Sequence, residues 1–135
     1  MSIEVRHLTT LLSVFDMPTS LKFYRDTLGF AVTQDTGQGD QSGWVMLQKA
    51  GVSLMLNTIY DDDERPATPN PANRSVHQDT CLYFLSPDPD AAYEFLRSKG
   101  LQIDPPTIAY YGMKQLYVRD PDGYTLCFQC QAERE

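Results

Sequence analysis

The sequence has few of the residues that build disulfide frameworks, zinc sites and membrane spans. Only three cysteines and two histidines occur among 135 residues, and an odd number of cysteines argues against a disulfide framework or a zinc knuckle. No apolar stretch approaches the roughly 20 residues that cross a bilayer. The first residues, Met1 to Arg6, lack the pattern of a signal peptide. We therefore expect a cytoplasmic protein with no membrane partner.

Basic residues are also scarce. Eleven Lys and Arg stand against 18 Asp and Glu, which gives a net charge of -7. Without a basic cluster the chain has no electrostatic footprint for a phosphate backbone, so we expect no nucleic-acid partner. Cationic ligands would meet no such repulsion. The length and the 41% hydrophobic content suffice for one domain with a core of its own.

What the sequence does contain is a repeat. Residues 20–30 (Ser-Leu-Lys-Phe-Tyr-Arg-Asp-Thr-Leu-Gly-Phe) return as residues 92–101 (Ala-Tyr-Glu-Phe-Leu-Arg-Ser-Lys-Gly-Leu), and each copy follows an apolar run closed by an aspartate. A second pair of similar segments, residues 51–57 and 123–129, recurs at nearly the same separation. Such repetition is typical of a duplicated unit. We expect a single domain over residues 1–135, with modules at about 1–60 and 77–135.

Each module carries one helix signal. The first helix begins after Asp16, has Pro18 in its first turn and ends at Gly29, a residue suited to a left-handed cap. The second begins at Pro89 and ends at Gly100. The expected buried stripes are Leu21, Phe23, Tyr24 and Leu28 in the first helix and Ala92, Phe95 and Leu96 in the second.

Short runs rich in β-branched or aromatic residues, bounded by Gly, Pro or Asp, predict eight strands. They cover residues 5–14, 30–33, 43–49, 52–58, 80–85, 103–110, 114–119 and 124–130. Each half then reads β-α-β-β-β.

The segment between the modules, residues 60–76, has a different character. It holds the acidic run Asp-Asp-Asp-Glu at residues 61–64, three prolines and no hydrophobic period, which predicts a long loop. One interpretation is a solvated linker between the halves. The other is a mobile acidic flap over a cavity, because long loops in compact domains are often functional.

Two motifs carry a family resemblance. Residues 16–30 follow the pattern Asp-x-x-x-Ser-x-x-Phe-Tyr-x-x-x-Leu-Gly-Phe, and residues 119–124 read Arg-Asp-Pro-Asp-Gly-Tyr. From about Val5 to Gln129 the chain resembles the vicinal oxygen chelate superfamily, which holds glyoxalase I, extradiol dioxygenases, fosfomycin-resistance enzymes and bleomycin-resistance proteins. The resemblance implies an α+β fold of two tandem βαβββ modules that form an open cupped mixed sheet around a central cavity. It does not indicate the activity.

Metal-dependent members of that superfamily hold a divalent ion with His or Gln, Glu, His and Glu on four strands. By the resemblance, these positions fall on Thr9, Met55, Cys81 and Cys127. Magnesium, manganese and ferrous iron favour carboxylate and imidazole donors, and neutral Thr and Met supply no charge to offset dehydration of the ion. We therefore expect neither a metal nor another cofactor.

His7 supports an alternative, displaced metal site. It lies two residues before the first ligand position, hence on the same strand face, and its repeat partner is Asp79. A site that adds Asn57 or Gln129 to this pair stays open as a hypothesis. His77 precedes the same strand as Asp79, and its simpler interpretation is a loop residue.

The cysteines also have two interpretations. If Cys81 and Cys127 face each other across the cavity, they offer a soft-metal site or a thiol nucleophile. A buried cysteine is more often a small hydrophobe.

Strand phase predicts a lining of apolar and aromatic side chains with a few hydroxyls, as expected of a small-molecule pocket. The predicted lining residues are Thr9, Leu11, Ser13, Trp44, Met55, Cys81, Tyr83, Tyr110, Met113 and Cys127, with Leu85, Tyr111 and Tyr117 as extensions. The simpler interpretation is that such residues fill a core.

Two functions of different classes remain. One is a metal-free binding protein for a hydrophobic or cationic aromatic ligand, similar to the bleomycin-resistance branch. The other is a divalent-metal-dependent lyase or dioxygenase acting on a substrate with vicinal oxygens, so whether the protein is an enzyme stays open. The replaced ligands, the aromatic lining and the negative charge favour the binder. We also expect a homodimer, because open sheets leave edges that pairing would cover.

Overall fold

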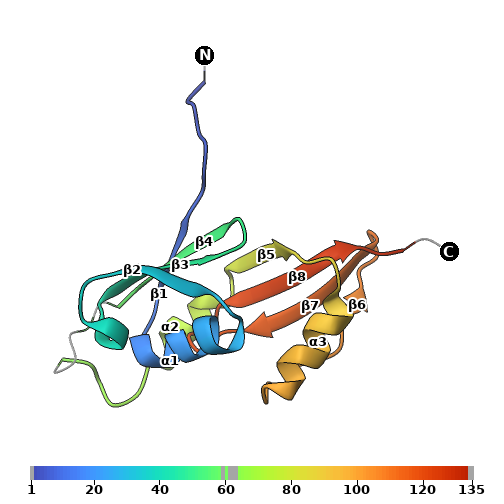
Figure 1. The fold of residues 1–135 in the computed structure, drawn as a ribbon. Helices are drawn as coiled ribbons and strands as arrows, with labels where there is room; N and C mark the ends of the chain where they lie inside the picture. The colour runs from blue at the N-terminus through green and yellow to red at the C-terminus, as the bar shows by residue number, and fades with distance from the viewer. Residues whose placement is uncertain (1, 59, 61–63, 134–135) are drawn as a thin grey trace. The chain divides into compact units, whose positions relative to one another are not determined.

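The computed structural model describes residues 2–58, 60 and 64–133 (Figure 1). The chain divides into two compact units, Met1–Thr68 and Pro69–Glu135. Each unit is built around its own four-stranded mixed sheet, so the fold is α+β with two βαβββ modules, as predicted.

The first unit contains β1 (Thr10–Ser13), α1 (Met17–Leu21), η1 (Lys22–Thr27), β2 (Ala31–Asp35), η2 (Gly39–Gln41), β3 (Trp44–Lys49) and β4 (Val52–Asn57). Its strand order is β1-β4-β3-β2. The β1–β4 pair is parallel, and the two other pairs are antiparallel. A register shift between Val32 and Gln34 interrupts the β2–β3 pair.

The first helix starts where the sequence predicts. The Asp16 carboxylate caps it by accepting a hydrogen bond from the Thr19 backbone N–H at 3.2 Å. Beyond Leu21 the helix widens into the π-helix η1, and the Leu28 N–H donates to the Phe23 carbonyl at 2.9 Å. Gly29 ends it with φ +88°, the left-handed conformation that favours glycine.

Strand alternation gives the first unit its core. Leu12, Val45, Leu47, Leu54 and Leu56 are at most 3% exposed, and they share one face of the sheet because directly paired residues point the same way. From the helical segment, Leu21, Tyr24 and Leu28 are buried as predicted, while Phe23 is partly exposed.

The second unit repeats this topology. It contains α2 (Pro71–His77), β5 (Cys81–Leu85), α3 (Pro89–Ser98), β6 (Thr107–Ile108), β7 (Met113–Arg119) and β8 (Thr125–Gln131). Its order, β5-β8-β7-β6, matches that of the first sheet strand for strand, with β5 and β8 parallel. The duplication predicted from the sequence is therefore present in the fold.

The helix α3 packs against β7 and β8. Its N-terminus is capped by the Asp88 carboxylate, which accepts from the Ala91 N–H at 3.1 Å, and Gly100 follows its end with φ +93°. Leu96 is buried at 3% exposure, but Phe95 is 51% exposed. The predicted burial of Phe95 is therefore wrong, because that side chain lies off the face that meets the sheet.

The loop predicted over residues 60–76 is wrong in its last part. Residues 71–77 form α2, capped by the Asn70 side chain, while the acidic residues 61–63 lie outside the described residues. His77 ends α2 with its ring stacked on Tyr124 at 4.1 Å between centroids, and its Nδ1 lies 2.8 Å from the Asp122 carbonyl oxygen. His77 therefore holds α2 to the turn before β8.

Two predicted strands are shorter than expected. Regular strand covers only Thr10–Ser13 of the segment 5–14 and only Thr107–Ile108 of the segment 103–110, although the Val14 and Ala109 N–H groups still donate to the carbonyls of Asn57 and Met113. Strand propensity alone does not make a strand, because a strand also needs hydrogen bonds to a neighbouring strand. In the part of the chain that the structure describes, no helix has both the length and the apolarity to span a bilayer.

Candidate ligand-binding site

The face of the second sheet opposite to Leu116, Val118 and Leu126 carries a row of aromatic and thiol side chains. Tyr117 on β7 pairs with Cys127 on β8, which pairs with Tyr83 on β5. Residues paired directly across strands project from the same face. Tyr83 and Tyr117 are 55% and 43% exposed, so both rings present surface on which a ligand can pack. We call this face, with residues 81, 83, 85, 113, 115, 117, 119, 125, 127, 129 and 131, the open face of the second sheet.

An amide lies at the centre of the next row. Gln115 pairs with Gln129, and its Nε2 donates to Gln129 Oε1 at 2.9 Å and to the Tyr111 hydroxyl at 2.8 Å. Its Oε1 accepts from the Tyr117 hydroxyl at 3.1 Å. The Gln115 amide therefore joins two tyrosines and a second glutamine into one network.

The thiols and phenols of this face stay protonated at neutral pH. Burial raises the pKa of Cys127 to about 11, and the nearby Cys81 adds to the shift. Burial also raises the pKa of Cys81, and burial together with hydrogen bonding to Tyr83 raises that of Tyr117. A thiolate nucleophile is therefore not favoured here.

Of the two interpretations of Cys81 and Cys127, the structure does not show the one in which they face each other across a cavity. The two lie on adjacent strands of one sheet, since Cys127 pairs with Tyr83, two residues along β5 from Cys81. Cys127 and Cys130 have the Cys-x-x-Cys spacing of many redox sites, but residues three apart in a strand point to opposite faces. All three cysteines are free thiols.

The first sheet has a corresponding face. Leu11, Met55 and Met46 form one cross-strand row, and Ser13, Asn57 and Trp44 form the next. Four residues of the predicted lining therefore share this face, namely Leu11, Ser13, Trp44 and Met55. Thr9 precedes β1 and is partly exposed.

The remaining predicted residues have mixed positions. Met113 begins β7 in phase with Gln115 and Tyr117, so it lies on the open face of the second sheet. Tyr110 is fully exposed in the turn before β7, and its ring forms a T-shaped contact with that of Tyr111 at 5.1 Å between centroids. Its place in a ligand site stays a prediction. His7 and Asp79 are exposed and lie outside regular strands.

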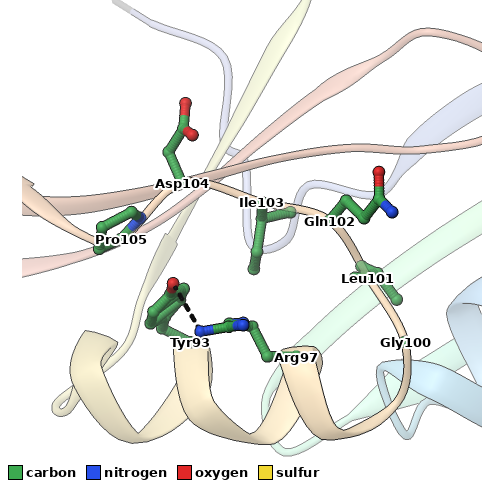
Figure 2. A pocket seen from close by; sticks show the side chains of 8 residues that line it. All are labelled: Tyr93, Arg97, Gly100, Leu101, Gln102, Ile103, Asp104 and Pro105. Carbon is green, nitrogen blue, oxygen red and sulfur yellow. Dashed lines mark hydrogen bonds between the residues drawn. The ribbon is translucent and has the colours of Figure 1, made fainter.

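Two hollows lie beside the segment that follows α3. One of about 630 Å³ lies between α3 and residues 100–105. There the Arg97 guanidinium donates to the Tyr93 hydroxyl at 3.3 Å, Ile103 points toward this pair, and Gln102 and Asp104 point away (Figure 2).

The second hollow, of about 730 Å³, shares Leu101–Asp104 and reaches β7 and β8 at Tyr117, Val118, Arg119 and Thr125. Its size falls in the range of small-molecule pockets, roughly 300–1,000 Å³. Since Tyr117, Arg119 and Thr125 belong to the open face of the second sheet, this hollow joins that face to the segment after α3.

Comparison with known proteins agrees with this architecture. The family profile described as Glyoxalase/Bleomycin resistance protein/Dioxygenase superfamily matches residues 5–128. The chain belongs to this superfamily. Among curated protein sequences, none is similar enough to count as a relative.

Solved structures share the fold at low sequence identity. The bleomycin-binding protein of Streptomyces verticillus, complexed with copper(II)-bleomycin, is 20% identical with a TM-score of 0.67, over 98% of this chain and 100% of that one. The bleomycin resistance determinant of transposon Tn5 is 22% identical with a TM-score of 0.70, over 96% and 100%. A glyoxalase/bleomycin resistance protein/dioxygenase from Nocardioides is 20% identical with a TM-score of 0.68, over 99% and 89%.

The superfamily's metal-ligand positions do not fit a hard divalent ion in this chain. Met55 pairs with Leu11, and Cys127 has a pKa raised to about 11, so its thiol would have to lose a strongly held proton to bind. A threonine, a thioether and two protonated thiols offer no carboxylate or imidazole. Within the residues that the structure describes, no three His, Cys, Asp or Glu side chains come together as a further site.

Sequence reasoning missed Gln115 as part of this face. The sequence does contain a signal for Gln115. It lies midway between Met113 and Tyr117, two predicted lining residues, and side chains two apart in a strand point to the same face. The partners of its amide were not available from the sequence, since they depend on the register of β7 against β8.

Proposed function

We propose that this member of the superfamily is a small-molecule binding protein that takes a hydrophobic or cationic aromatic ligand without a metal. The observation that carries the proposal is the hollow of about 730 Å³ that opens beside Tyr117, next to the row Tyr83–Cys127–Tyr117.

The chemistry of the row suits an aromatic ligand. Two neutral phenol rings flank a buried thiol, so the surface is apolar apart from its hydroxyl tips. A ligand ring that stacks on one tyrosine gains about 0.5–1.5 kcal/mol beyond its buried area. A cation over the ring face gains about 0.5–2 kcal/mol.

Three further observations support a binder over an enzyme. The residues at the superfamily's metal positions include no carboxylate or imidazole, and the thiols on the open face are protonated at neutral pH. Two solved structures with the same fold are a bleomycin-binding protein and a bleomycin resistance determinant. Fold alone does not transfer a ligand, so the proposal depends on the side chains of this face.

A thermal-shift screen tests the proposal. Planar aromatic compounds, neutral and cationic, are tested with a chelator and again with Mg²⁺, Mn²⁺, Fe²⁺ or Zn²⁺. We expect binding compounds to raise the melting temperature equally in both conditions. Tyr117→Leu should reduce the shift, while Phe95→Leu, a half-exposed ring on α3, serves as the matched control.

The metal-dependent lyase or dioxygenase is the outcome that would replace this proposal. Elemental analysis of protein purified without chelator should show no stoichiometric Mg, Mn, Fe, Ni or Zn. About one metal per chain, lost in His7→Ala, would overturn the metal-free binder. So would diols or oxyanions that stabilise the protein only when metal is added.

A further inference from the structure

The hollow of about 730 Å³ lies where the edge of β7 loses its neighbouring strand. β6 ends at Thr107, which lies opposite Gln115 on β7. Two residues earlier the same register would place Pro105 opposite Tyr117, but proline has no backbone N–H to donate to a neighbouring strand. The described residues 101–106 therefore run beside β7 outside the sheet, and the hollow lies between residues 101–104 and β7.

Two groups of opposite charge line this hollow. Of the described residues in its wall, Asp104 is acidic and Arg119 is basic. Asp104 points away from the Tyr93–Arg97 pair of the other hollow (Figure 2), and Arg119 belongs to the open face of the second sheet. Among the residues that the structure describes, neither charged group forms an ion pair or a side-chain hydrogen bond. The hollow therefore offers a carboxylate and a guanidinium that do not neutralise each other.

An aromatic ring lies beside the basic group. Tyr117 and Arg119 are two apart on β7, so their side chains share a face, with Cα atoms roughly 7 Å apart. Thr125 lies opposite Arg119 on β8 and adds a hydroxyl to the same wall. Because the Tyr117 side chain is partly exposed, a ligand ring can pack on it. A ligand whose ring and anionic group are a few bonds apart fits this pair of residues.

We infer that the ligand is a zwitterionic aromatic molecule of the amino-acid type, with its ammonium group held by Asp104, its carboxylate held by Arg119 and its ring packed on Tyr117. The inference rests on the proposed function and narrows it from hydrophobic or cationic aromatic ligands to those that also carry an anion. A carboxylate suits Arg119 because a planar guanidinium donates two parallel N–H bonds to it. An ammonium group suits Asp104 because an ionised carboxylate only accepts hydrogen bonds.

Four forms of one naphthalene compound test this inference. 3-(2-Naphthyl)alanine is the zwitterion, its methyl ester is a cation, its N-acetyl derivative is an anion, and its N-acetyl methyl ester is uncharged. Dissociation constants are measured by ligand-observed NMR with the full chain at about pH 6, where amines are protonated and carboxylates ionised. We expect each charge to tighten binding about threefold, and the zwitterion to bind about tenfold more tightly than the uncharged form.

Substitutions of the two charged residues locate the effect. Asp104→Asn should remove the gain from the ammonium group and keep the gain from the carboxylate, and Arg119→Met should do the reverse. Glu94→Gln on α3 and Arg97→Met beside the other hollow are the matched controls.

The controls separate local contacts from the field of the whole protein. They change the net charge of -7 by the same amounts as the test variants, so any effect of overall charge appears in both sets. Both controls should keep the pattern of the parent chain. The uncharged form should bind every variant equally, which shows that the hollow stays intact.

The outcomes separate this inference from the proposed function. If the four forms bind with equal affinity, or if the cation binds tightest, the zwitterion assignment is overturned and the aromatic binder stands. A charge preference that survives Asp104→Asn and Arg119→Met, or that the controls lose as well, would also overturn it. If no form binds, the inference fails, and the proposed function fails with it only when the thermal-shift screen also finds no ligand.

Discussion

Gly100 and Gly123 have nearly the same backbone angle but different surroundings. Their φ values are +93° and +90°. A Cβ added at Gly100 would meet nothing within 4 Å, whereas one added at Gly123 would lie 2.6 Å from the backbone oxygen of Arg74 on α2. Alanine at Gly100 would therefore report backbone strain alone, whereas alanine at Gly123 would report the same strain together with the close packing of α2 on the turn before β8.

We predict that Gly123→Ala is far more destabilising than Gly100→Ala. The left-handed conformation costs alanine about 1–2 kcal/mol at either site. At Gly123 the Arg74 backbone must also move, which should bring the total to roughly 3 kcal/mol or more. Urea unfolding of both variants measures the difference. Equal losses would mean that α2 does not pack on this turn.

The buried thiol of Cys127 makes stability depend on pH in the alkaline range. Burial raises its pKa from 9.0 to about 11. The unfolded chain therefore loses this proton first, and above pH 9 it binds fewer protons than the folded chain. The free energy of unfolding must fall as pH rises from 9 to 11, with no contribution below pH 9.

The variant Cys127→Ala tests this dependence. Its unfolding free energy should fall less steeply between pH 9 and 11 than that of the parent chain, even though the smaller side chain lowers stability at every pH. Cys127 also contributes to the raised pKa values of Tyr83 and Tyr117, so the difference between the two curves reports the thiol together with its effect on these two phenols. Parallel pH curves would contradict the prediction.

At the scale of elements, both repeated helices begin with an aspartate N-cap, but the two aspartates have different neighbours. Asp16 and Asp88 each cap a helix by accepting from a backbone N–H three residues on. Asp16 also accepts from the Thr19 hydroxyl and forms an ion pair with Arg65 at 3.2 Å, in which both side chains are about three-quarters buried. Asp16 therefore links the helix start to the segment after β4.

We predict that Asp88→Ala costs about 1 kcal/mol, as for an ordinary N-cap, and that Asp16→Ala costs more. Loss of the Asp16 carboxylate removes the helix cap and also breaks the ion pair with Arg65. A double-mutant cycle with Arg65→Met should give a coupling energy of about 0.5 kcal/mol or more. Urea unfolding provides all four values. A coupling energy near zero would show that the ion pair adds nothing to the cap.

At the scale of the whole molecule, exposed apolar side chains and open strand edges indicate association. In the second unit Leu85 is 87% exposed, Ile108 is 64% exposed, and β6 covers only two residues of the β7 edge. In the first unit Ile3, Val5 and Leu8 are each at least 79% exposed. Proteins rarely leave such groups without cover.

We predict a homodimer at micromolar concentration. Pairing two copies would bury these side chains and edges in a closed, symmetric contact. Light scattering coupled to size exclusion gives the mass directly, against 15.3 kDa for one chain. Leu85→Lys should shift the equilibrium toward monomer, and Gln131→Lys on the same sheet is the control. A monomeric mass for the parent chain would refute the prediction.

Much of the fold follows from local pattern. The helix starts at Asp16 and Asp88 and the ends at Gly29 and Gly100 were predictable, because caps depend on residues within one turn of each other. The repeat predicted two modules of equal topology, and the family motifs predicted the superfamily that the comparison then showed. Alternation along strands placed Leu12 in the core and Leu11 on the other face.

Other features depended on contacts between distant segments. α2 has no hydrophobic period of its own and is held by His77 on Tyr124, so its sequence resembled a loop. Of the strand expected over residues 103–110, only Thr107–Ile108 pairs with β7 as regular strand, and this pairing depends on a segment that the local sequence does not contain.

The candidate site also combines features that the sequence predicts with features that depend on tertiary structure. From the sequence by itself, the period of two along each strand predicted that Tyr83, Tyr117 and Cys127 lie on the cavity-lining face of their own strands. Only the register of β5, β8 and β7 decided that they form a single row, that Cys81 and Cys127 are neighbours, and that Gln115 joins Tyr111 to Gln129. Periodicity is a property of one strand, whereas register is fixed by hydrogen bonds between strands that are remote in the chain.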